Sequence, residues 1–167
     1  MNTQILFSGL LVFTTLTTLL VTGLLLTFAL LVMPGLGKLS DRAFLQGFQV
    51  IDGIIQRGHP VFVVVWLGSV GGLILAAITG FGLLDGWPRG LLITAAALYV
   101  LGVQLPTIRG NVPLNNQLQT LELATLSEPA LAGARQAFEP TWNRLNLLRT
   151  VLCLVVAVLL ILLCVLR

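Results

Sequence analysis

The sequence predicts an all-α integral membrane protein, an up-down four-helix bundle that crosses a bilayer. The first observation is composition, since 57% of the 167 residues are hydrophobic and only 9% are charged, whereas soluble domains average about 25% charged residues. The second is that apolar residues gather in four long runs near the ~20 residues that a bilayer core requires. A net charge of +3 is too small to indicate nucleic-acid binding, so the lipid bilayer is the expected partner.

The four runs predict four spans within one membrane domain, residues 1–167. The spans are expected at about residues 5–33, 61–84, 91–108 and 147–166. The first is expected to end at Pro34 and the second to begin at Pro60, because proline stops a helix but is tolerated in its first turn. Helicity before the fourth span is expected to begin near Thr141.

Two longer connections separate the spans on one side of the predicted bundle. In residues 40–56, apolar residues recur at steps of four and three, which places them on one helical face. This segment is too short and too polar to span, so we expect an interfacial amphipathic helix between the first and second spans. Residues 111–140 form the other connection, which is expected to be helical in part.

Cationic residues are divided unevenly between the two sides of the bundle. The two long connections and their borders contain Lys38, Arg42, Arg57, Arg109, Arg135, Arg144 and Arg149. The opposite side contains only Arg89 and Arg167. Because positive side chains are retained preferentially in the cytoplasm, we expect a multi-pass protein of the inner or plasma membrane with both long connections cytoplasmic.

Polar side chains gather at this predicted cytoplasmic end, and one group lies at the start of the fourth span. Trp142, Asn146 and Arg149 are separated by four and three residues, which puts them on one face of a helix. An arginine inside an apolar run usually faces a cavity or a partner, so this group could form a binding site. Alternatively, Arg149 extends toward the lipid headgroups and Trp142 anchors the interface.

Two further polar groups are predicted at the same end. Asn111 and Asn115 follow the third span, where their amides could bind a polar ligand or cap the next helix. Gln49, Asp52 and His59 lie along one side of the amphipathic segment. His59 could act beside Asp52 as a general base, since its usual pKa is near working pH, or it could be a polar anchor at the interface.

No metal-ligand cluster, phosphate-binding loop or Ser-His-Asp set occurs in the sequence, so no cofactor is predicted. A weaker alternative is a haem b or quinone redox protein in which His59 is one axial haem ligand. The second ligand would then come from another copy in a homo-oligomer. A third alternative is a non-catalytic membrane subunit or assembly factor, in which Arg149 pairs with Asp52 or Glu139 and ties helices together.

Several segments match family motifs in order and spacing across nearly the whole chain. Residues 111–115 read N-V-P-L-N, and residues 142–150 read W-x-x-L-N-x-x-R-T, with Leu145 where a second aromatic residue is usual. Residues 48–52 read F-Q-x-I-D, with Asp52 where the motif has asparagine. Together these segments resemble the DUF1772 family, which includes the anthrone-oxygenase-like membrane proteins.

The resemblance implies a four-helix membrane protein that oxidises a hydrophobic small molecule. Its characterised relatives convert an anthrone to an anthraquinone with O2, without a metal or flavin. The expected function is therefore oxygenation of a hydrophobic aromatic or quinone-like compound at the cytoplasmic end of the bundle. The expected catalytic residues are His59, Asp52 and Arg149. The expected substrate-binding residues are Gln49, Asn111, Asn115, Trp142 and Asn146.

Overall fold

The computed structural model describes residues 3–166, and these residues form helices joined by short turns, which confirms the predicted all-α bundle. In chain order the elements are α1 (Thr3–Thr27), η1 (Phe28–Val32), α2 (Met33–Leu36), α3 (Asp41–Gln56), α4 (Pro60–Leu83), α5 (Gly86–Ala97), η2 (Leu98–Gln104), η3 (Thr107–Asn111), α6 (Val112–Gln119), η4 (Leu123–Thr125) and α7 (Glu128–Leu166). The segments η1, η2 and η3 are π-helical, and η4 is a 3₁₀ turn.

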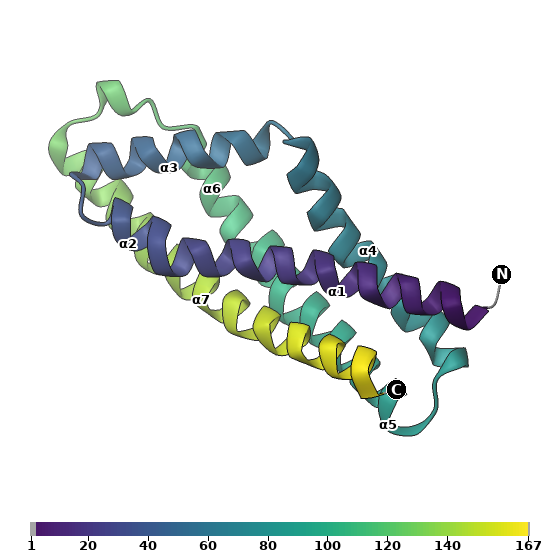
Figure 1. Cartoon of the computed structure of the whole chain (residues 1–167). Coiled ribbons are helices and arrows are strands. Elements are labelled where there is room, and N and C mark those ends of the chain that lie inside the picture. Colours follow the sequence, from purple (N-terminus) through teal and green to yellow (C-terminus); the bar gives the residue numbers. More distant parts are fainter. Residues whose placement is uncertain (1–2, 167) are drawn as a thin grey trace.

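Four continuous helices are long and apolar enough to cross a membrane, so the chain is a multi-pass membrane protein. They cover Thr3–Leu36, Pro60–Leu83, Gly86–Gln119 and Glu128–Leu166. Around the bundle, α1 packs against α4 and α7, and α5 packs against the same two helices. Consecutive long helices run in opposite directions, and both chain ends lie at one end of the bundle (Figure 1).

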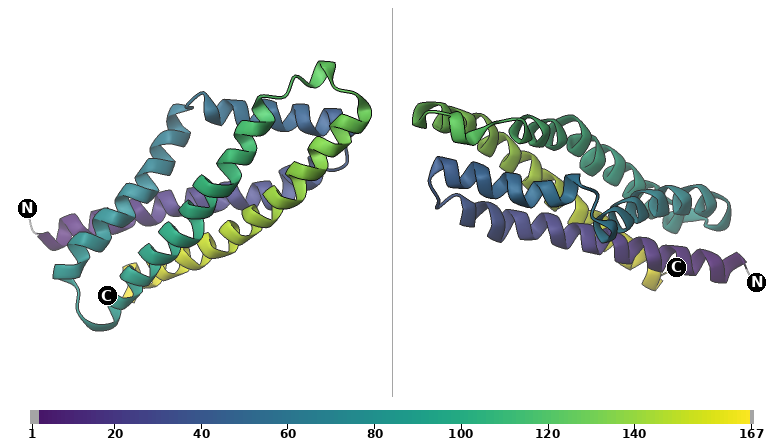
Figure 2. Two further views of the ribbon diagram at one scale, coloured as in Figure 1. Left: turned by 180° about the vertical axis from the view of Figure 1, so that it is seen from behind. Right: turned by 90° about the horizontal axis from the view of Figure 1, so that it is seen from above.

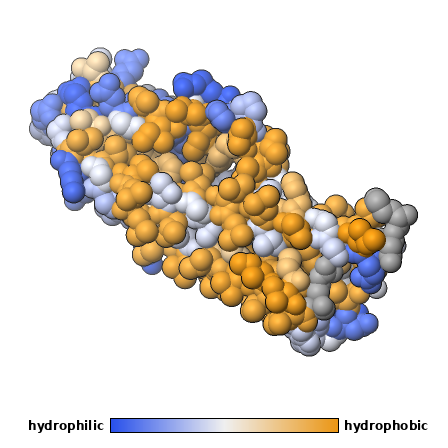
Figure 3. Space-filling model, in the orientation of Figure 1, coloured by the Kyte–Doolittle hydropathy of each residue, from blue (hydrophilic) through white to orange (hydrophobic). Residues whose placement is uncertain are grey.

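The outer surface of the bundle is apolar, whereas its interior is closely packed. Leu31, Ile78, Leu101 and Val165 are 63–71% exposed, while Leu11 and Leu160 are fully buried between helices. In Figure 3 hydrophobic residues cover the middle of the visible face, and hydrophilic residues gather at the two ends. This distribution suits lipid around the middle and water at the ends, because exposed apolar area on such a scale is unfavourable in water.

The first helix continues past the proline at which it was expected to end. Pro34 lies in the first turn of α2, directly after the π-helical segment η1. Inside a continuous helix a proline removes one backbone hydrogen bond, and a local π turn can accommodate this loss. The wider π turn therefore allows the helix to run on to Leu36.

The third and fourth helices are also longer than the predicted spans. The third continues through η2, η3 and α6 as far as Gln119, instead of ending at Ile108 (Figure 2, left). The fourth, α7, begins at Glu128 rather than near Thr141, and it contains Pro140 in its interior. The connection between these helices is consequently short, and only residues 120–127 lie outside them.

The amphipathic helix α3 lies across one end of the bundle, between α2 and α4 in the chain (Figure 1). The hydroxyl of Ser40 caps it by accepting from the Ala43 N–H. Phe44 and Phe48 are buried where α3 packs on α6 and α7. Gly58, with a φ of 73°, makes the turn into α4, a conformation that glycine adopts at little cost.

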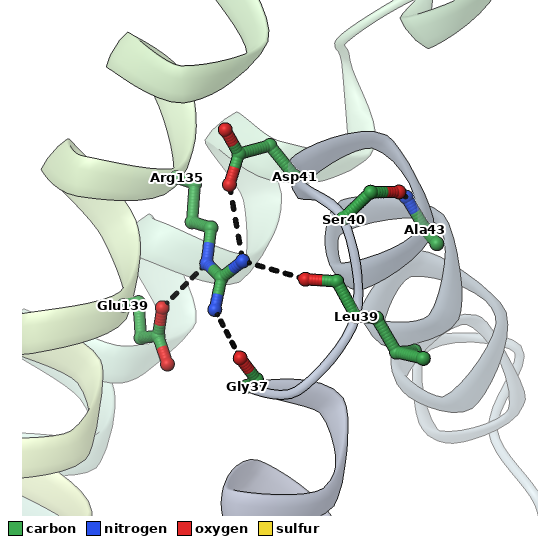
Figure 4. Close-up of polar contacts among 7 residues, drawn as sticks. All are labelled: Gly37, Leu39, Ser40, Asp41, Ala43, Arg135 and Glu139. Atoms are coloured by element: carbon green, nitrogen blue, oxygen red, sulfur yellow. Dashed lines mark hydrogen bonds and ion pairs between the residues drawn. The ribbon is translucent and has the colours of Figure 1, made fainter.

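An arginine of α7 fastens the turn before α3 to the bundle (Figure 4). The Arg135 guanidinium donates to the backbone carbonyls of Gly37 and Leu39 and to the carboxylates of Asp41 and Glu139, at 2.7–3.0 Å. It also lies 4.4 Å from the centroid of the buried Phe44 ring. This cluster fixes the N-terminal end of α3 above α7.

Candidate active site

A cavity of about 200 Å³ lies beneath α3, where the four long helices meet. Residues from α1, η1, α3, α4, η3, α6 and α7 line it, and most of them are apolar or aromatic. The lining consists of Leu24, Leu25, Phe28, Phe48, Asp52, Ile55, Phe62, Trp66, Thr107, Asn111, Val112, Asn115, Trp142, Asn146 and Arg149. Such a cavity suits a largely apolar ligand that carries a few polar groups.

Aromatic rings form two sides of the cavity. On one side the Trp142 ring lies 5.6 Å from Phe28 and 5.3 Å from Phe48, measured between centroids. On the α4 side, the Phe62 and Trp66 rings stack at 5.5 Å. Flat, rigid walls of this kind favour a planar ring system, because aromatic pairs gain from stacked and edge-on contacts.

Asp52 places a buried carboxylate in this apolar cavity, since its side chain is only 3% exposed. Its Oδ1 accepts a hydrogen bond from Asn115 Nδ2 at 2.7 Å, and its Oδ2 accepts from Gln56 Nε2 at 2.7 Å and Gln119 Nε2 at 2.9 Å. Three amide donors compensate for part of the hydration that the carboxylate loses on burial. They also hold the carboxylate in one orientation.

Asn115 links this carboxylate to the aromatic wall. Its side-chain oxygen accepts from the Trp142 indole N–H at 2.8 Å, while its amide nitrogen donates to Asp52. One residue of α6 therefore sets the orientation of a group on α3 and a group on α7. The residue spacing within α6 places Gln119 one turn beyond Asn115, so both amides reach Asp52 from the same face.

Arg149 brings a buried cation to the same cavity. The residue is 4% exposed, and its Nη1 and Nη2 donate at 3.0 Å to Thr107 Oγ1 and Asn146 Oδ1. Its Nε has no hydrogen-bond partner, and within residues 3–166 Arg149 forms no ion pair. The ion pair that the non-catalytic alternative expected with Asp52 or Glu139 is therefore not formed, and Glu139 pairs with Arg135 instead.

Two asparagines anchor the site to the helix backbones. Asn146 Nδ2 donates to the carbonyl oxygen of Leu25 at 3.1 Å, and Asn111 Nδ2 donates to that of Trp142 at 3.3 Å. Leu25 lies just before the π segment η1, and Asn111 ends the π segment η3. π-helical turns often occur at functional sites, and here they flank the cavity on two helices.

The structure brings six of the eight predicted site residues to one cavity, although they come from three distant parts of the sequence. These are Asp52, Asn111, Asn115, Trp142, Asn146 and Arg149. The other two predicted site residues, His59 and Gln49, do not line the cavity. His59 is exposed at the N-terminus of α4, beyond the Gly58 turn. Gln49 bonds to the carbonyls of Leu118 and Leu121, which fastens α3 to the end of α6.

Several residues of the site were not predicted from the sequence. Thr107 holds Arg149, and Gln119 holds Asp52. Phe62 and Trp66 form the second aromatic wall. Thr107 precedes Asn111 by four residues, and this helical spacing would have indicated Thr107 if the third helix had been extended past its predicted end.

Comparison with known protein families shows to which family the chain belongs. The family model described as "Anthrone oxygenase" matches residues 53–159, which is more than half of the chain. The chain belongs to the anthrone oxygenase family. No curated protein and no solved structure was found to match it.

Within this anthrone oxygenase family member, the matched residues supply most of the polar lining. They include the segment from Asn111 to Arg149 and begin one residue after Asp52. The carboxylate of Asp52 thus completes the cavity from outside the matched segment. Chemically, the arrangement offers a carboxylate, a cation and aromatic walls around one cavity.

Proposed function

We propose that the protein is a membrane oxygenase that converts an anthrone-type aromatic ketone to the corresponding quinone with O2. One observation carries the proposal: a single aromatic-walled cavity holds a buried carboxylate, Asp52, and a buried guanidinium, Arg149, that do not pair with each other. Two opposite charges that are kept apart in an apolar space suit a substrate that develops negative charge as it loses a proton.

Substrate binding is the first step of the proposed mechanism. The planar ring system lies between the wall of Trp142, Phe48 and Phe28 and the pair formed by Phe62 and Trp66. Its ketone oxygen faces Arg149, the one cation of the lining. The ligand reaches the cavity from the lipid, in which such compounds dissolve.

Proton removal is the second step. Asp52 takes a proton from the ring CH2 group opposite the ketone, and the electron pair delocalises to the ketone oxygen as an enolate. The Arg149 guanidinium stabilises the resulting oxyanion. In this scheme Asn115 and Asn146 act as positioning residues, because their amides bind Asp52 and Arg149 directly.

Oxygen transfer completes the scheme, with the substrate itself as the reductant. The enolate gives one electron to O2, and the carbon radical and superoxide combine to form a C–O bond. Asp52 returns the first proton to the peroxide and then removes the second proton from the same carbon, while the O–O bond breaks and hydroxide leaves. The hydroxide takes this proton from Asp52 to form water, which restores the carboxylate. The CH2 carbon loses four electrons and becomes a carbonyl, and O2 supplies the carbonyl oxygen and one water.

The test measures oxidation of anthrone by the purified protein in detergent or nanodiscs, against the spontaneous rate in the same buffer. We expect faster oxidation, with one O2 consumed for each quinone formed. Gln117→Leu is a matched control for cavity variants, because Gln117 is an exposed amide on α6 outside the cavity lining. If the wild-type protein leaves the spontaneous rate unchanged, the proposed activity is wrong.

A further inference from the structure

A second hollow, which we call the outer groove, lies between the end of the first long helix and α7. Its volume is about 270 Å³, and it opens on the outer surface, where Pro34 and Leu147 are exposed. Its lining consists of Ala29, Met33, Pro34, Gly37, Glu139, Asn143, Asn146 and Leu147. Asn146 is the residue that it shares with the cavity beneath α3.

The outer groove extends from the polar end of the bundle into its apolar belt. At one end, Gly37 follows α2 and begins the turn to the amphipathic helix α3, where hydrophilic residues gather on the surface (Figure 3). At the other end lie Ala29 and Leu147. One turn farther into the membrane, Leu26 and Val151 are 41% and 52% exposed. A polar end at headgroup depth that continues into an apolar face matches the two parts of a phospholipid.

Glu139 offers an unused carboxylate oxygen to this groove. Its Oε2 accepts from Arg135 Nε at 2.7 Å, whereas its Oε1 has no hydrogen-bond partner within residues 3–166 (Figure 4). Glu139 is half-buried, and Oε1 is not one of the fully enclosed polar atoms. It lies beside Gly37, only 3.4 Å from the place where a Cβ on that glycine would be. A ligand in the groove can therefore reach this oxygen.

The charges around Glu139 do not balance. Arg135 is shared between Asp41 and Glu139, so one guanidinium faces two carboxylates. Arg42, which follows Asp41 in the chain, pairs with Glu128 instead. The cluster therefore carries one excess negative charge, and it attracts a cationic group to the groove, where limited contact with water strengthens the interaction.

Asn143 adds a second acceptor, one helical turn from Glu139. Side chains at this spacing are neighbours, with about 5–6 Å between their Cβ atoms. Asn143 is half-buried, and its side-chain amide forms no hydrogen bond with any described residue. The amide of Asn146 is not available, because it bonds to the Leu25 carbonyl and to Arg149. An ammonium group has three N–H donors, so one such group can bond to Glu139 and Asn143 together.

We propose that the outer groove binds phosphatidylethanolamine, whose primary ammonium donates to Glu139 Oε1 and Asn143 Oδ1. The phosphate lies toward Lys38, an exposed cation beside Gly37 that forms no ion pair within residues 3–166. The acyl chains follow the apolar faces of α1 and α7. A choline headgroup lacks the N–H donors, and a serine headgroup adds a carboxylate that Glu139 repels. This lipid site does not depend on the oxygenase activity.

The test measures the binding of single lipids to the purified full chain by native mass spectrometry. The probes are phosphatidylethanolamine, phosphatidylcholine and phosphatidylglycerol with the same palmitoyl and oleoyl chains, so that acyl-chain burial does not distinguish them. We expect phosphatidylethanolamine to bind about 5- to 20-fold more tightly than phosphatidylcholine, because only its headgroup donates hydrogen bonds to a charged acceptor. Phosphatidylglycerol, which has no cationic group, should bind most weakly.

Two variants locate the preference in the groove. Asn143→Leu leaves the Arg135 cluster intact and should lower the preference for phosphatidylethanolamine over phosphatidylcholine to within about threefold, since one of two hydrogen bonds is lost. Glu139→Gln removes the excess charge and should lower the preference at least as far. Gln136→Leu is the matched control on α7, because Gln136 is exposed and outside the groove lining, and it should keep the wild-type preference.

Three results would overturn the proposal. Equal binding of the ethanolamine and choline lipids to wild type would show that no ammonium site exists, and this measurement needs no variant to fold. Tightest binding of phosphatidylglycerol would show that the surface cations, rather than Glu139, select the lipid. A preference that persists in both Asn143→Leu and Glu139→Gln would show that the ethanolamine lipid binds elsewhere on the protein.

Discussion

Two arginines on α7 show opposite ways of placing a cation. Arg135 binds two carboxylates and two backbone carbonyls at the edge of the bundle, where its side chain is 17% exposed (Figure 4). Arg149 lies 14 residues later, about 21 Å along the helix axis. It is 4% exposed, has two neutral partners and leaves its Nε unpaired.

The difference separates a stabilising role from a functional one. Arg135 joins α7 to the turn before α3, so its bonds hold the fold together. A buried cation without a carboxylate partner is costly, and folded proteins tolerate such a cost mainly at functional sites. Arg149 is therefore expected to matter for binding and reaction more than for folding.

The largest expected effect comes from removing the carboxylate that shares the cavity with Arg149. Asp52→Asn should lower the rate of anthrone oxidation by about 10²- to 10⁴-fold, because a general base contributes on this scale. The variant should fold, since an asparagine oxygen still accepts from neighbouring amides. The measurement is the oxidation rate above the spontaneous background. A variant whose rate stays within about threefold of wild type would show that Asp52 is not the base, because a general base contributes about 10²-fold or more.

Arg149→Met tests the unpaired cation directly. Activity should fall by about 10²- to 10³-fold, because an oxyanion-stabilising donor contributes roughly this much. Thermal stability in detergent should stay equal or rise, since a buried unpaired charge is replaced by an apolar chain of similar length. A large fall in melting temperature would instead assign Arg149 a structural role and remove the contrast with Arg135.

Arg135→Met should show the reverse pattern. Stability should fall by about 1–2 kcal/mol, a figure reduced for the partial exposure of the ion pairs. Activity per folded molecule should stay close to wild type, because Arg135 does not line the cavity. Melting curves and oxidation rates of the same preparation provide both numbers, and activity lost without any loss of stability would contradict this assignment.

His59→Gln should have the smallest effect. The residue is exposed and lies outside the cavity lining, so the oxidation rate should stay within about twofold of wild type, which is far below a general-base contribution. A loss of oxidation rate as large as that expected for Asp52→Asn would show that His59 takes part in the reaction. It would also show that α3 and α4 rearrange when substrate binds.

Much of the site was predictable because helical spacing is a local property. The steps of four and three from Trp142 to Arg149 and the apolar face of α3 hold in the structure as helix faces. The position of His59 could not be predicted from helical spacing, because it depends on the Gly58 turn rather than on the periodicity of α3. The first helix was predicted to end too early, at Pro34, and the fourth was predicted to begin too late, near Thr141. Proline is a local signal that tertiary packing can override.

The sequence by itself determined the membrane class, the number of long helices and which polar residues share a helix face, because hydrophobic length and periodicity act along the chain. Only the tertiary structure decided that Asp52, Asn115 and Arg149 face one cavity, and that Asp41 and Glu139, rather than Asp52, are paired with an arginine. These outcomes depend on how three separate helices cross, and the free energy of that packing comes from contacts between residues far apart in the chain.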